Sequence, residues 1–267
     1  MTIRRAFADL SVGQVHHAVC GDAQAPAVLL LHQSPRSWAE YREVLPLIAG
    51  AGYRVIAMDT AGFGDSADGG VPASIAQWAR VACELLDALG IAQADVVGHH
   101  TGGVIAIELA AAFPERVRSL VLSSTPYTDE VFRRARAQRP PIDEVAPSDD
   151  GSHLAALWQK RQAFYPPGRP DLLEAFVRDA MKVGHRVEEG HRAVASYRME
   201  DCIGRVTQPT LIVRATLDPF AAPHAAELQH HLPQARIVDI DGGMVPLPDQ
   251  MPEAFARTVL DFLATRP

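Results

Sequence analysis

The first residues that could do chemistry lie at a corner between an apolar strand and an apolar helix. Gly98, His100 and Gly102 alternate along this corner, after strand residues 95–97 and before the Ala-rich helix residues 104–110. Side chains at the two glycine positions would collide with the neighbouring strand and helix, so the corner requires glycine there. The central residue is held on a sharp turn and faces the pocket. The pattern therefore makes His100 a candidate catalytic residue.

The elements around this corner alternate between buried strands and helices. Short continuous apolar runs are typical of strands buried on both faces of a parallel sheet. After two short strands within 3–20, we expect strands at 27–32, 53–59, 95–97, 117–123, 209–215 and 236–240. Helices are expected at 37–51, 74–90, 101–113, 223–231 and 252–263. This rhythm predicts an α/β fold with a mostly parallel, doubly wound sheet.

The alternation stops at residue 124, and no convincing strand follows before residue 208. This pattern predicts a core domain made of 1–124 and 208–267, with a helical insertion at 125–207. Aromatic residues of the insertion are candidates either for lining an apolar pocket or for packing inside the insertion. They are Tyr127, Phe132, Trp158, Phe164 and Tyr165.

Composition narrows the class of protein. The chain has 267 residues, of which 48% are hydrophobic, which suits one α/β domain carrying an insertion. A net charge of −7 does not indicate a nucleic-acid partner. No apolar run has the length of a membrane span or of a signal peptide, so we expect a cytoplasmic protein without membrane contact. The three cysteines are widely spaced and fit no metal-binding pattern.

Two further blocks accompany the corner and together point to a known family. Residues 29–35 read Leu-Leu-Leu-His-Gln-Ser-Pro, and residues 59–66 read Asp-Thr-Ala-Gly-Phe-Gly-Asp-Ser. With the corner at 98–102, they resemble the oxyanion loop, the following turn and the nucleophile elbow of the α/β-hydrolase superfamily, in its branch with a cap domain. The resemblance implies a mostly parallel eight-stranded sheet with helices on both faces and a helical cap at 125–207.

The resemblance also implies positions for the catalytic groups. An ordinary member carries Ser, Asp or Cys at the elbow, an acid after a later strand and a histidine after the last strand. Here the elbow residue is His100, Asp218 occupies the acid position, and Met244 stands where the histidine is expected. Met244 cannot act as a base. A serine triad needs an imidazole to take the serine proton, and neither member of that pair is present at its usual place.

One hypothesis links the two departures. Imidazole is longer than a serine side chain, so His100 could extend across the gap left at Met244 and hydrogen-bond Asp218. Such a dyad would activate water or remove a proton from carbon, while the backbone N–H groups of Ser34 and Thr101 hold the developing oxyanion. Further candidates for the oxyanion and substrate site are His32, Gln33, Met244, Trp158 and Tyr127.

Other interpretations remain open at this point. The chain could be a lyase or isomerase on the same fold, or an inactive protein that only binds its ligand. His32, His99, His100 and Asp218 could form a metal site, although we assign no metal and no cofactor. A relocated base could come from His185, His191 or His224, and Ser34 could be an unconventional nucleophile. The expected partner is a small-molecule substrate, and the chain is expected to be a monomer or a homodimer.

Overall fold

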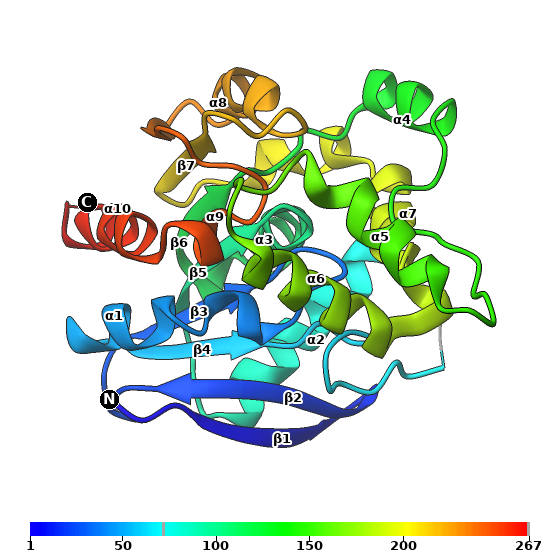
Figure 1. Ribbon diagram of the computed structural model, residues 1–267. Coiled ribbons are helices and arrows are strands. Elements are labelled where there is room, and N and C mark those ends of the chain that lie inside the picture. The colour runs from blue at the N-terminus through cyan, green and yellow to red at the C-terminus, as the bar shows by residue number, and fades with distance from the viewer. Residues whose placement is uncertain (71–72, 266–267) are drawn as a thin grey trace.

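The computed structural model describes residues 1–70 and 73–265, which form one sheet flanked by helices (Figure 1). Its eight strands lie in the order β1-β2-β4-β3-β5-β6-β7-β8. The first two pairings of that order, β1 with β2 and β2 with β4, are antiparallel, and the others are parallel. The strands are β1 Arg4–Leu10, β2 Gly13–Cys20, β3 Ala27–Leu31, β4 Arg54–Met58, β5 Ala94–His99, β6 Val117–Ser123, β7 Thr210–Ala215 and β8 Arg236–Ile240. The predicted fold class is confirmed.

Helices cover both faces of the sheet because its central strands are apolar throughout. Every residue of β3 and β5 is buried, so each strand presents side chains to a core on either side. One core includes residues of α2 Ile75–Ala88, α3 Thr101–Ala112 and α8 Ala225–His231. The other includes residues of α1 Val44–Gly50 and α10 Pro252–Thr265. The sheet is therefore held rigidly, and so are the residues at its strand ends.

The prediction of a single helix at 37–51 is wrong. A 3-10 turn at Trp38–Tyr41 precedes a separate α-helix, α1. Proline has no N–H and is tolerated only in the first turn of a helix, so Pro46 requires α1 to begin just before it. A further short helix, α9 Leu247–Gln250, lies between the expected strand at 236–240 and the expected helix at 252–263.

The described chain between β6 and β7 contains helices and turns but no strand. Its α-helices are α4 Glu130–Ala137, α5 Ser152–Gln162, α6 Pro170–Val183 and α7 Glu189–Ser196. Of the contacts that join this segment to the rest of the molecule, two lie at the loop after β3. The Arg36 Nε donates to Asp179 of α6 over 2.9 Å, and a Cβ added to Gly190 of α7 would lie 1.9 Å from the Ser34 hydroxyl oxygen. The helical segment therefore lies directly against the loop that follows β3.

No helix among the described residues combines the length and the apolar character needed to cross a membrane.

Candidate functional site

The corner between β5 and α3 places His100 in an unusual backbone conformation. His100 has φ of 48° and ψ of −112°, a region that side chains rarely adopt. The neighbouring glycines explain how the corner closes. A Cβ at Gly102 would lie 2.0 Å from the Leu31 carbonyl oxygen, and one at Gly98 would lie 2.2 Å from the Gly102 carbonyl oxygen. The strand, turn and helix therefore pack closely enough to leave His100 projecting from the tip.

This packing gives a first testable expectation. Gly102→Ala should destabilise the protein by about 1–3 kcal/mol or more, because the added methyl meets backbone that cannot move without shifting β3. Gly50→Ala is the matched control, since nothing lies within 4 Å of a Cβ at that helical position. The control should be neutral or stabilising by about 0.5–1 kcal/mol. Urea unfolding measures both, and equal stability of the two variants would contradict the close packing.

His100 and Asp218 meet at the carboxyl ends of β5 and β7. The His100 Nε2 lies 2.7 Å from the Asp218 Oδ2, with 14% of the imidazole and none of the carboxylate exposed. The two atoms are close, but they are not aligned as a hydrogen bond, and neither has another hydrogen-bond partner among the described residues. The structure therefore shows a short contact between a ring nitrogen and a carboxylate oxygen.

Asp218 is an ionised carboxylate at neutral pH. Burial alone would raise the pKa of Asp218, but His100 and the backbone N–H of Phe220 stabilise its charge and lower the pKa to about 2. The N–H groups of Phe220 and Ala221 donate to Oδ1 over 2.9 and 3.3 Å. Oδ1 is thus held by the backbone, and Oδ2 is left to face His100.

His99 holds the loop that carries Met244. Its Nδ1 lies 3.0 Å from the Ser123 Oγ, and its Nε2 lies 2.8 Å from the Val245 carbonyl oxygen. Burial, together with the neighbouring His100, lowers the pKa of His99 to about 3, so its ring is neutral. Met244 is half-buried and donates its N–H to the Gln250 Oε1 over 2.7 Å. His99 therefore positions the loop and does not serve as a second base.

The loop after β3 lies against the start of α3. Ser34 donates its N–H to the Thr101 Oγ1 over 3.4 Å, so Ser34 and the first residue of α3 are neighbours. His32 uses both ring nitrogens within the backbone, with Nδ1 2.8 Å from the Gln33 carbonyl and Nε2 3.0 Å from the Thr60 N–H. His32 therefore orients this loop and leaves no ring nitrogen for a ligand.

Gln33 is turned away from the corner. Its backbone N–H and its side-chain amide both donate to the buried Glu40 carboxyl group, over 3.0 and 2.5 Å. Gln33, which stands where the resembled family has glycine, therefore serves to satisfy Glu40. This contact also removes the Gln33 N–H from the set of possible oxyanion donors.

Glu40 should make stability depend on pH. Burial raises the pKa of Glu40 to about 8 against the lowering effect of Arg36, from an ordinary value of 4.5. A raised pKa means that the folded protein holds this proton more tightly. Protonated Glu40 therefore contributes its full stabilisation of the folded protein below pH 4.5, and this contribution is lost as the pH rises towards 8. The slope is at most about 1.4 kcal/mol per pH unit.

Glu40→Gln tests this dependence, because an amide keeps the shape, stays neutral and can pair with Gln33. Urea unfolding from about pH 5 to about pH 8 should show a smaller loss of stability in the variant than in the wild type. An identical slope in both proteins would show that Glu40 does not titrate in this range.

The aromatic candidates separate into two groups. Trp158, Phe164 and Tyr165 belong to a cluster within the helical segment that also includes Val245, next to Met244. Tyr127 instead stacks on His231 of α8 at 4.7 Å and belongs to a core of the sheet. The structure therefore places Trp158 against the same cluster as Val245, and it places the Tyr127 ring in a core of the sheet.

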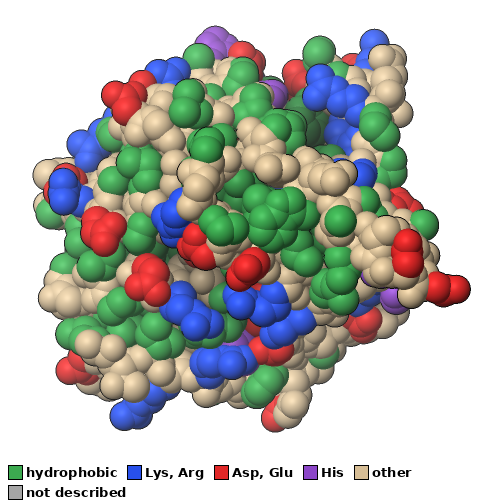
Figure 2. Space-filling model, viewed as in Figure 1, with side chains coloured by type: hydrophobic (Ala, Val, Ile, Leu, Met, Phe, Trp, Pro, Cys, Tyr) green, Lys and Arg blue, Asp and Glu red, His purple; other side chains and the backbone are tan. Residues whose placement is uncertain are grey.

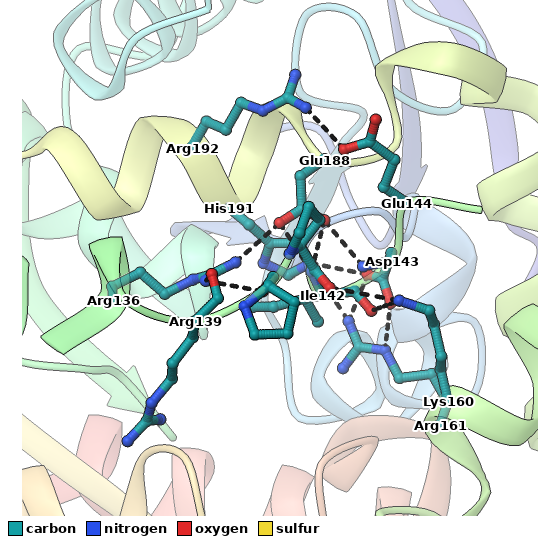
Figure 3. Close-up of polar contacts among 12 residues, drawn as sticks. Arg136, Arg139, Ile142, Asp143, Glu144, Lys160, Arg161, Glu188, His191 and Arg192 are labelled. Carbon is teal, nitrogen blue, oxygen red and sulfur yellow. Dashed lines mark hydrogen bonds and ion pairs between the residues drawn. The ribbon is translucent and has the colours of Figure 1, made fainter. Parts of the chain in front are cut away.

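The histidines considered as relocated bases have other surroundings. His185 is exposed, and the ring of His224 packs against Phe132. His191 lies 2.7 Å from Asp143, which also pairs with Arg161 (Figure 3).

The His191 cluster fastens a loop of the helical segment to α7. Glu188 accepts N–H groups from Ile142 over 2.9 Å and from Asp143 over 2.8 Å, and it pairs with Arg136 at 2.9 Å (Figure 3). Buried carboxylates with this many donors are typical of structural networks. We therefore assign His191 to the structure of this segment.

The predicted alternative of a metal site at His32, His99, His100 and Asp218 lacks ligands, because both ring nitrogens of His32 and of His99 are already bonded. Among residues 1–70 and 73–265, one other group has ligand atoms close together, namely His16, Asp59 and Asp65. Those atoms are bonded within the protein: His16 Nδ1 lies 2.8 Å from Asp59, and Lys182 pairs with Asp65 at 2.7 Å. Neither group presents a free ligand set.

Sequence reasoning missed Ser124 and Arg36. Ser124 is a buried residue with φ of 45°, directly after β6, and Arg36 is a buried cation that contacts Asp179 and Asp249. A serine pair at a strand end was visible at 123–124, but its backbone conformation was not. For Arg36, the partners lie 143 and 213 residues away, and no local pattern marks them.

Comparison with known proteins agrees with this architecture. The family model described as alpha/beta hydrolase fold matches residues 26–249. The chain is 40% identical over 144 residues to epoxide hydrolase B of Mycobacterium tuberculosis, covering 52% of this chain and 40% of that protein. It is 30% identical over 230 residues to the putative carbamate hydrolase RutD of Azorhizobium caulinodans, covering 79% of this chain and 82% of that protein.

Solved structures share the fold at lower identity. A hydrolase from Pseudomonas aeruginosa PA01 superimposes with a TM-score of 0.81 and 23% sequence identity, covering 98% of both chains. Among the curated sequence relatives, the matches to epoxide hydrolases span less than half of those proteins, 19% of the pig bifunctional enzyme and 40% of epoxide hydrolase B.

Proposed function

Because this chain belongs to the alpha/beta hydrolase fold family, we propose that it hydrolyses a small, largely apolar molecule whose reacting group is an ester, a lactone or a carbon–carbon bond beside a carbonyl. The observation that carries the proposal is the 2.7 Å contact between the His100 Nε2 and the Asp218 Oδ2. A histidine held in a rare backbone conformation against a buried carboxylate is the arrangement expected of a general base.

The chemistry follows from which atoms are already engaged. With Nε2 turned towards Asp218, Nδ1 is the ring nitrogen left to take a proton from water. The hydroxide equivalent then attacks the carbonyl carbon, and its oxygen becomes an oxyanion. Ser34 lies against the start of α3, where the helix dipole favours negative charge, and its N–H makes only a long hydrogen bond of 3.4 Å to the Thr101 Oγ1. We infer that the oxyanion replaces this hydroxyl as the acceptor of the Ser34 N–H and also accepts from the Thr101 N–H. Asp218 stabilises the imidazolium that forms.

An apolar substrate is favoured by the side chains next to Asp218. Leu217 is 59% exposed and Phe220 is 37% exposed, on either side of the buried carboxylate. Phe220 also contacts Phe164 of the helical segment, with ring centroids 4.6 Å apart. In Figure 2 the surface is hollowed between the regions of α8 and α4, and hydrophobic side chains lie in the hollow. Exposed apolar side chains beside a reactive group favour binding of an apolar ligand.

We also propose that residues 125–207 act as a cap over a core formed by 1–124 and 208–267. The contacts of Asp179 with Arg36, of Gly190 with Ser34 and of Phe164 with Phe220 support this division, since all three join the helical segment to loops at the carboxyl ends of strands. The cap would then supply the substrate-facing side chains.

A substrate panel tests the proposal. It contains 4-nitrophenyl esters of increasing chain length, simple lactones and a β-diketone, together with styrene oxide and an aryl carbamate because of the relatives named above. We expect turnover of at least one carbonyl compound by the wild type and loss of that turnover in Asp218→Asn. The control is Asp239→Asn, which removes an exposed carboxylate on β8 that pairs with Arg214. Binding without turnover across the panel would contradict a hydrolase and favour a ligand-binding protein.

A further inference from the structure

Ser124 shares its backbone strain with His100. Among residues 1–70 and 73–265, these are the two non-glycine residues with positive φ, at 45° for Ser124 and 48° for His100. Such a conformation costs free energy in any residue with a side chain, and it persists only where the surroundings impose it. Two neighbouring residues strained in the same way indicate that the positions of their side chains matter.

The order of the strands places Ser124 beside the catalytic pair. β6 lies between β5 and β7, so the contact from His100 to Asp218 must extend across the end of β6. Ser124 follows the last residue of that strand. Hydrogen bonds fix it there on both sides: the His100 N–H donates to the Ser123 carbonyl over 3.0 Å, and the Ser124 N–H donates to the Val213 carbonyl over 2.9 Å.

The Ser124 hydroxyl is buried and has no hydrogen-bond partner among the described residues. The neighbouring hydroxyls are engaged, since Ser123 contacts His99 and Thr125 donates to the Ser123 carbonyl. A buried hydroxyl left unpaired destabilises the folded protein, because it has given up its hydrogen bonds to water. Strain and an unpaired polar atom at one residue, next to a base, together indicate a group that binds a ligand of the reaction.

We propose that the Ser124 hydroxyl positions the water molecule that His100 deprotonates. The proposal rests on the hydrolytic function proposed above. One O–H of the water points to His100, which takes that proton, and the second O–H donates to a lone pair of the Ser124 Oγ. The water oxygen forms the new bond to the carbonyl carbon, and the carbonyl electron pair moves to the oxygen held by Ser34 and Thr101. No bond of Ser124 breaks, so Ser124 is not a nucleophile.

Two substitutions at Ser124 separate this role from backbone strain. Ser124→Gly removes the hydroxyl and relieves the positive φ, whereas Ser124→Ala removes the hydroxyl and keeps the strain. Both variants should lower kcat by about 10- to 100-fold with little change in KM, since water and not substrate loses its position. The matched control is Thr128→Val, which removes another buried hydroxyl without a described partner and should leave kcat unchanged.

A crystal structure of the wild type supplies a readout that does not need activity. We expect an ordered water within about 3.2 Å of both the Ser124 Oγ and a ring nitrogen of His100. A Ser124 hydroxyl bonded to protein with no such water would overturn the inference, and so would full kcat in Ser124→Gly. A fluorophosphonate adduct on Ser124 would also overturn it, by making the residue a nucleophile. If the water is present but the wild type turns over no compound of the panel, the proposed function fails while the water site stands.

Discussion

Replacing His100 with alanine should lower kcat by roughly 10²- to 10⁴-fold, the range that a positioned general base contributes. The imidazole is the group that faces the ionised Asp218, and the described residues offer no second histidine at this contact. The variant leaves the buried Asp218 Oδ2 without its ring partner, which should cost stability. The fold should survive, since backbone N–H groups still hold Oδ1, and circular dichroism checks this before the kinetics are compared. Steady-state kinetics on the best substrate of the panel measures the effect.

Two controls show whether a loss of kcat in His100→Ala comes from the His100 ring itself. His185→Ala removes an exposed histidine and should leave kcat unchanged. His100→Gly should also lose turnover, but it relieves the positive φ and should be more stable than His100→Ala. If His100→Ala keeps its kcat within about threefold of the wild type, the base lies elsewhere and the proposed mechanism is wrong.

Arg36→Met should lower the free energy of unfolding by about 3–5 kcal/mol, the usual cost of removing one partner from a buried ion pair. The Arg36 side chain is 1% exposed, and it donates to Asp179 over 2.9 Å and to Asp249 over 2.6 Å. Those carboxylates belong to α6 and α9, so the loss should loosen the helical segment against the loop after β3. Urea denaturation followed by far-UV circular dichroism measures it.

Whether unpaired carboxylates cause this loss of stability can be tested by neutralising Asp179 and Asp249. Adding Asp179→Asn and Asp249→Asn to Arg36→Met should recover much of the lost stability, because no buried charge then remains unpaired. Arg198→Met removes an exposed ion pair with Asp201 and should cost less than about 1 kcal/mol. An Arg36→Met protein as stable as Arg198→Met would contradict the structural importance of this cation.

Much of the fold could be predicted because its signals are local. The continuous apolar runs of β3, β5 and β6 and the glycines at 98 and 102 follow from packing at fixed positions. The pairing of His100 with Asp218 was also accessible, since both follow parallel strands whose carboxyl ends meet at one edge. Two sequence features suggested the contact between His100 and Asp218. The side chain at position 100 is longer than serine, and position 244 carries Met instead of histidine.

The remaining features depend on contacts distant in sequence. Arg36 and Asp179 are 143 residues apart, and nothing near either residue marks the other. The direction of the Tyr127 ring towards His231 was decided by packing of α8, which aromatic content alone cannot specify. The positive φ of Ser124 accompanies hydrogen bonds that join Ser123 to the His100 N–H and Ser124 to Val213 of β7. Residue types predicted the candidates, whereas their orientations required the structure.

The most direct test of the His100–Asp218 mechanism is intact-protein mass spectrometry of the enzyme quenched during steady-state turnover of its best ester substrate. General-base activation of water forms no covalent intermediate on a serine, so the mass should be that of the unmodified chain while product accumulates. A stoichiometric acyl adduct on any serine would contradict the mechanism and would show that the chain has kept a serine nucleophile outside the corner at His100.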